Sequence, residues 1–218
     1  MTSSRVFRFS GGALLVGAAA FVVHLVARSA ITAGADLATV AKQGLWQPIN
    51  ALGVVGAALV LLGMPGMYAR MGTPAGALGL LGVTLIALAW LFFGIFLSLF
   101  SLLIAPWLAD RAPSLLVASE PQPAAILAAF LVSLVAQTAG VVLLAIPFLR
   151  GRMHPRWIGW ALPASAFLTV LGDLLAPSGP SSNLALNLLS NSGPMLLLIV
   201  LGAIGLRMRR GPSPTMAP

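Results

Sequence analysis

The chain has 218 residues, of which 59% are hydrophobic and only 7% are charged, and its formal net charge at pH 7 is +8. An ordinary soluble domain has about 25% charged residues, so this chain cannot cover a soluble core with polar side chains. Its basic residues are spread in small groups between apolar runs instead of gathering on one polar face, which argues against a nucleic-acid partner. The composition predicts an all-α integral membrane protein.

Catalytic and cofactor motifs are missing from the sequence. The absence of cysteine excludes disulfides, thiol catalysis and thiolate metal sites. Neither Gly-x-Ser-x-Gly nor His-Glu-x-x-His occurs. His24 falls near the outer side of the predicted bundle and His154 at its inner side, so the two residues are too far apart to bind one metal ion. We therefore expect no cofactor and no metal, and we do not favour an enzyme.

Six apolar stretches are long enough to cross a membrane as helices, since a crossing needs about 20 residues. In chain order they cover residues 11–31, 48–69, 76–105, 124–149, 156–176 and 186–206. The gaps between them are too short to hold a soluble domain. We expect one six-helix transmembrane bundle over residues 1–210 and a disordered cytoplasmic tail over residues 211–218.

The first stretch admits two interpretations. Arg5 and Arg8, an apolar run and the small residues 33–35 also fit a cleaved signal peptide. However, His24 and Arg28 interrupt the apolar run, which favours a retained helix. These two residues are four apart, so they lie on the same helix face.

Ionisable residues inside a membrane span are costly and are functional candidates. Arg28 and Asp173 fall at a similar predicted depth near the outer ends of the first and fifth helices. We predict that they form an ion pair, because pairing avoids an uncompensated buried charge. The alternative is that Arg28 extends its guanidinium to the outer lipid headgroups.

Several uncharged polar residues also fall in the outer half of the predicted bundle. Asn187 and Asn191 share a face of the sixth helix, and Gln137 lies near the middle of the fourth. Together with His24, they would line a polar pocket if they converge. The alternative is a structural network, because amide and hydroxyl groups commonly join membrane helices by hydrogen bonds.

The distribution of arginine predicts the orientation. Nine arginines fall on one side of the six-span arrangement without an acidic residue, whereas Lys42 and Arg111 share the other side with acidic residues. The positive-inside rule then places both termini in the cytoplasm. The cluster of Arg150, Arg152 and Arg156 would act as an orientation signal or contact lipid headgroups. Tryptophans such as Trp46 and Trp107 are expected at the membrane boundaries.

The predicted inner turns carry a resemblance. The segments 62–70, 76–82 and 155–160 resemble those of small uncharacterised multi-pass membrane proteins of bacteria. The resemblance implies membrane residence and no particular activity. Eleven of the twelve basic residues are arginine, which also favours a bacterial source, so we expect a bacterial cytoplasmic membrane.

Three functional hypotheses follow. The first is a non-enzymatic structural or partner-binding component of the membrane, with lipids, a second copy or another membrane protein as partners. The second is a protein that binds or transports a small solute through the outer polar cluster. The third is an enzyme acting on a lipid. A closed bundle without a cavity would favour the first hypothesis, and a pocket reaching Gln137 would favour the second.

Overall fold

The computed structural model describes residues 3–116, 123–151, 153, 155–175 and 183–210. This part of the chain is all-helical and contains no strand. Six helices in this part of the chain are long and apolar enough to cross a membrane: Arg5–Thr32, Trp46–Gly72, Pro74–Arg111, Ala124–Leu149, Arg156–Leu175 and Ser192–Arg209. They match the six predicted stretches in order, so the all-helical class and the six apolar helices are confirmed.

The part of the chain that holds the first three spans comprises several elements. They are α1 (Ser3–Thr32), α2 (Leu37–Ala41), α3 (Trp46–Trp90), the π-helix η1 (Leu91–Phe96), α4 (Leu97–Leu99), the π-helix η2 (Phe100–Ile104), α5 (Ala105–Arg111) and the 3-10 helix η3 (Pro113–Leu116). Of these, α2 and η3 lie outside the spans. The last three spans lie in α6 (Ala124–Leu149), α7 (Arg156–Leu175) and α9 (Ser192–Arg210), and the short α8 (Leu184–Ser190) precedes α9.

The long α3 contains the second span and the first part of the third, joined by a tight turn. Gly72 and Gly76 have φ values of 56° and 57°, in the region where glycine meets no steric penalty from a side chain. Pro74, which lies between them, has no N–H to continue a helical ladder. The turn therefore reverses the chain between the second and third spans.

Two predicted boundaries differ from the structure. The first helix begins at Ser3 and not at residue 11, so Arg5 and Arg8 lie within its first turns. The predicted helix over 186–206 is broken into α8 and α9 at Asn191, because Pro194 cannot donate a hydrogen bond to the carbonyl four residues earlier. The predicted tail over 211–218 lies outside the described residues.

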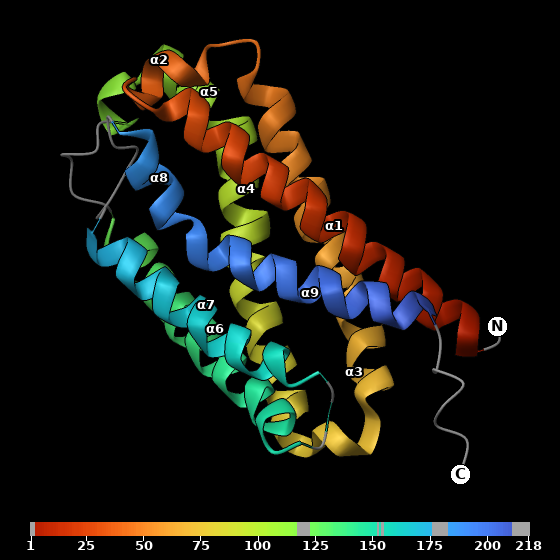
Figure 1. The fold of residues 1–218 in the computed structure, drawn as a ribbon. Coiled ribbons are helices and arrows are strands. Elements are labelled where there is room, and N and C mark those ends of the chain that lie inside the picture. The colour runs from red at the N-terminus through yellow and green to blue at the C-terminus, as the bar shows by residue number, and fades with distance from the viewer. Residues whose placement is uncertain (1–2, 117–122, 152, 154, 176–182, 211–218) are drawn as a thin grey trace.

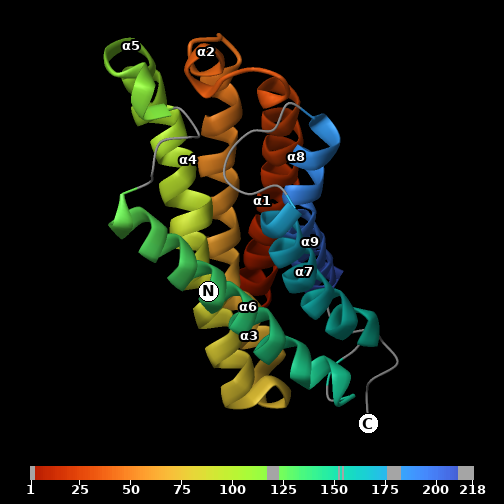
Figure 2. The same cartoon turned by 90° about the vertical axis from the view of Figure 1, so that its left-hand side faces the viewer.

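The spans form a closed ring (Figures 1 and 2). α1 packs against α3 and α9, α3 packs against α6, α6 against α7, and α7 against α9. The ring thus follows the order of the chain and closes where the first and last helices meet.

Glycines allow neighbouring helices to touch through their backbones. A Cβ atom on Gly82 of α3 would lie 2.8 Å from the carbonyl oxygen of Gly140 on α6. A Cβ atom on Gly11 of α1 would lie 2.6 Å from the carbonyl oxygen of Gly205 on α9. Such contacts allow the van der Waals packing that stabilises membrane helices in the absence of a hydrophobic driving force.

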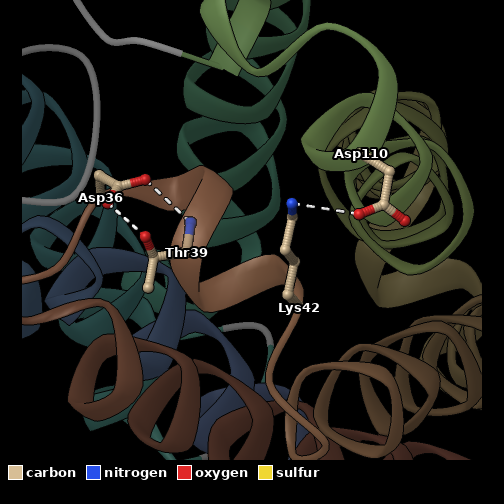
Figure 3. Close-up of polar contacts among 4 residues, drawn as sticks. All are labelled: Asp36, Thr39, Lys42 and Asp110. Atoms are coloured by element: carbon tan, nitrogen blue, oxygen red, sulfur yellow. Dashed lines mark hydrogen bonds and ion pairs between the residues drawn. The ribbon is translucent and has the colours of Figure 1, made fainter.

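Short helices cover one end of the bundle, where α2 and α5 lie together (Figure 2). The Nζ atom of Lys42, after α2, forms an ion pair of 3.1 Å with Asp110 of α5 (Figure 3). Asp36 caps α2 by accepting hydrogen bonds from the backbone N–H and the hydroxyl of Thr39, and these bonds lower the pKa of the Asp36 carboxyl.

Trp46 is the first residue of the second span, at the predicted boundary, but its side chain does not lie on the bundle surface. It is fully buried beneath α2 and α5, and its Nε1 atom donates a hydrogen bond of 2.6 Å to the carbonyl oxygen of Ser101. The bond joins the second span to the third and satisfies the indole N–H. Trp107, in contrast, is 58% exposed, as a boundary residue would be.

Candidate functional site

A cavity of about 160 Å³ lies inside the ring, in the half of the bundle nearer to α2 and α5. Its polar lining comes from four of the six spans and from the helix break between α8 and α9. These polar residues are His24, Arg28, Ser98, Gln137, Thr169, Asp173, Ser190 and Asn191. The cavity therefore brings together side chains that are up to 167 positions apart in the sequence, from His24 to Asn191.

The predicted polar cluster converges on this cavity, with one exception. Arg28, Asp173, Gln137 and Asn191 line it together with His24. Asn187 is buried nearby and is not part of the cavity wall.

His24 is held in one orientation at the cavity. Its Nδ1 atom lies 2.8 Å from the carbonyl oxygen of Ile49, and because a carbonyl only accepts, Nδ1 carries the proton of the neutral ring. Nε2 is then an acceptor, and it is buried without a hydrogen-bond partner. Gly53 makes room for the ring, since a Cβ atom there would lie 2.9 Å from the imidazole.

Arg28 and Asp173 are half-buried and line the same cavity, yet they form no ion pair within 4.0 Å in the structure. The guanidinium carbon of Arg28 lies 5.7 Å from the centroid of the Trp46 ring, which is a cation–π geometry. Arg28 therefore remains near the cavity and is anchored by an aromatic face. The predicted direct pair with Asp173 is therefore not formed in this structure.

The buried amides have different surroundings. Asn187 donates through Nδ2 to the carbonyl oxygen of Ser29, at 3.3 Å, and to the hydroxyl of Thr32, at 3.5 Å, which joins α8 to α1. Asn191 also reaches α1, with 3.2 Å between Nδ2 and the Ser29 hydroxyl. Among the described residues, Gln137 has no hydrogen-bond partner although it is 5% exposed. Gln137 is thus available to a molecule in the cavity.

Irregular helix geometry surrounds the cavity. The π-helix η1 follows Trp90 and contains Phe93, and both line the wall. On the opposite side, Ser190, Asn191 and Pro194 line the wall at the break between α8 and α9. π-helical turns are frequent at functional sites, and discontinuous membrane helices commonly form solute sites. The backbone therefore departs from regular α-helix where the polar side chains meet.

Aromatic side chains that were not predicted from the sequence form the rest of the cavity wall. Phe21 and Trp90 pack edge to face with 4.9 Å between ring centroids, and Phe93 packs against Phe130 at 5.4 Å. The Nε1 atom of Trp90 is buried without a hydrogen-bond partner. The position of Trp90 in mid-span was the available signal, since tryptophan is otherwise typical of membrane boundaries.

The remaining predicted residues lie elsewhere. Arg150 and Arg156 are exposed at the end of the bundle that carries the Gly72–Gly76 turn, and Arg152 lies outside the described residues. In the described part of the chain, no three His, Asp or Glu side chains are grouped so as to hold a metal ion.

Comparisons with known proteins give no independent assignment. No protein-family model matches the chain. No curated protein and no solved structure matches it either. The function must therefore be argued from the geometry of the cavity.

Proposed function

We propose that the protein binds a small polar solute within the membrane, in the cavity between Arg28, Asp173 and Gln137. The observation that carries the proposal is a single cavity that reaches Gln137 and has a basic and an acidic side chain on its wall. This is the outcome that distinguishes solute binding from a purely structural bundle. The cavity therefore favours the second hypothesis over the first.

The size and chemistry of the cavity restrict the ligand. A cavity of about 150 Å³ in another protein accommodates benzene, so about 160 Å³ is suited to a ligand of comparable size. Arg28 offers hydrogen-bond donors to an anionic or carbonyl group, and Asp173 attracts a cationic or donor group. Phe21 and Trp90 provide apolar and cation-binding faces. A small zwitterion fits this combination best.

The arrangement of the charges also supports binding over packing. A structural pair would bring the guanidinium and the carboxylate into direct contact, because an isolated charge in the membrane is costly. Arg28 and Asp173 instead face one cavity without an ion pair. A ligand with both charges would neutralise both side chains at once. We further propose that this half of the bundle faces outward from a bacterial cytoplasmic membrane, with both termini inside.

Cysteine accessibility tests the proposal, because the chain contains no cysteine of its own. A Gln137→Cys variant should react with a small methanethiosulfonate reagent, and a panel of small zwitterionic amino acids should include at least one that slows the reaction. Arg28→Gln and Asp173→Asn should each abolish that protection. No reaction at Gln137→Cys would refute a solute-accessible cavity, and reaction without protection by any zwitterion would refute the proposed ligand class.

Ser133 provides the matched control. It lies one turn from Gln137 on α6 and is also buried, but it does not line the cavity. Ser133→Cys should react far more slowly than Gln137→Cys. Equal reaction at both positions would show general opening of α6 and would contradict a defined site.

A further inference from the structure

α1 and α9 meet near the N-terminus of the chain, at the other end of the bundle from α2 and α5 (Figure 1). A second, open groove lies along this contact. Its volume is about 710 Å³, and it does not share a lining residue with the cavity described above. Arg8 and Arg209 lie on its wall, together with Phe9, Gly12 and Val16 of α1. The groove thus combines two guanidinium groups with an apolar surface.

We propose that this groove binds the headgroup and one acyl chain of an anionic phospholipid. The two arginines are exposed and come from different helices, which cross at Gly11 and Gly205. The stem of Arg209 lies against Gly11, because a Cβ atom there would be 3.2 Å from the Arg209 Cγ atom. The backbone contact between the helices therefore brings both guanidinium groups to the same groove.

Neither of the two helices that form the groove has an acidic side chain to pair with these arginines. The sequence has no acidic residue before Asp36 and none after Asp173, so neither α1 nor α9 contributes a carboxylate. An anion that pairs with Arg8 and Arg209 would therefore come from outside the two helices. Basic pockets between membrane helices are suited to anionic lipid headgroups, and arginine binds phosphate through two parallel hydrogen bonds.

The apolar part of the groove favours a lipid over a free phosphate ion. Phe9 is 65% exposed and Val16 is 56% exposed, and Val23 continues the same exposed line along α1. Val16 lies eight residues beyond Arg8, which is about 12 Å along the helix axis. The surface therefore passes from charged to apolar over the depth at which a phospholipid passes from headgroup to acyl chain.

Lipid binding can be measured by native mass spectrometry on the full chain in a maltoside detergent. Dioleoyl phosphatidylglycerol should bind more tightly than dioleoyl phosphatidylcholine. Arg8→Gln and Arg209→Gln should each weaken binding of phosphatidylglycerol by about fivefold and leave phosphatidylcholine unchanged. Arg5→Gln, which removes an exposed arginine of α1 outside the groove, is the matched control and should have no effect.

Gly12→Leu tests the acyl part of the site with both arginines in place. A Cβ atom at Gly12 meets no other atom within 4 Å, so the substitution fills the groove without disturbing the helix contacts. It should weaken binding of both lipids and leave thermal stability unchanged. If Arg5→Gln weakened phosphatidylglycerol binding as much as Arg8→Gln, the proposal would be overturned in favour of diffuse charge attraction. Unimpaired binding in Gly12→Leu, or equal displacement of phosphatidylglycerol by glycerol 3-phosphate, would overturn the role of the acyl chain.

Discussion

The side chains of Asn187 and Gln137 are both buried amides, at 6% and 5% exposure. Asn187 joins α8 to Ser29 and Thr32 of α1, whereas Gln137 lines the cavity and has no hydrogen-bond partner among the described residues. Removing a bonded amide leaves its partner unsatisfied, and removing an amide that faces a cavity does not. The consequences of substitution should therefore differ.

We expect Asn187→Ala to lower the free energy of unfolding by about 1 kcal/mol, since hydrogen bonds between membrane helices contribute about 0.6 kcal/mol each. Gln137→Leu should leave stability nearly unchanged. Thermal unfolding of the purified variants in detergent measures both effects. A loss of stability in Gln137→Leu as large as that in Asn187→Ala would mean that Gln137 is also a structural tie.

At the level of elements, glycine contacts determine how closely the helices approach. Gly82 of α3 faces the backbone of α6, and a Cβ atom there would lie 2.8 Å from both the Gly140 oxygen and the Leu144 nitrogen. Neither backbone atom can move without shifting a helix. The contact between the third and fourth spans therefore has no room for a methyl group.

Gly82→Ala should destabilise the bundle by about 1–3 kcal/mol, the usual cost of overpacking. Gly12→Ala is the matched control, because Gly12 is also helical and a Cβ atom there meets nothing within 4 Å. Alanine is the better helix former, so the control should be unchanged or slightly more stable. Thermal unfolding in detergent compares the two, and equal destabilisation would contradict the close contact.

At the level of the whole molecule, the two ends of the bundle differ in charge. One end carries the start of α1 and the Gly72–Gly76 turn, with exposed arginines on several elements. The other end carries α2 and α5 and the Lys42–Asp110 ion pair. By the positive-inside rule, we propose that the arginine-rich end faces the cytoplasm.

Reporter fusions test this orientation. Fusions after residues 72, 153 and 212 should have cytoplasmic reporters, and those after residues 40, 115 and 180 should have external ones. The fusion after residue 153 is decisive, because it follows Arg150 and Arg152 in the strongest arginine cluster. An external reporter at that position would contradict the proposed orientation.

The sequence by itself determined the membrane class, the six apolar helices and the identity of most polar cavity residues. Apolar stretches of sufficient length must form helices in lipid, because every backbone polar group needs an internal partner. Charged and amide residues within such stretches were identifiable for the same reason, since lipid-facing positions do not tolerate them. Arg28, Asp173 and Gln137 were found in this way.

Only the tertiary structure decided how those residues are used. The ring order of the helices brings His24, Gln137 and Asn191 to one cavity, and it assigns Asn187 to a contact with α1 instead. The break at Asn191, the burial of Trp46 and the groove between Arg8 and Arg209 also depend on packing between distant segments. Hydropathy depends on the composition of each stretch of the chain, so it can be read from the sequence. These features depend instead on which helix faces meet in the bundle. The close glycine contacts determine which faces meet.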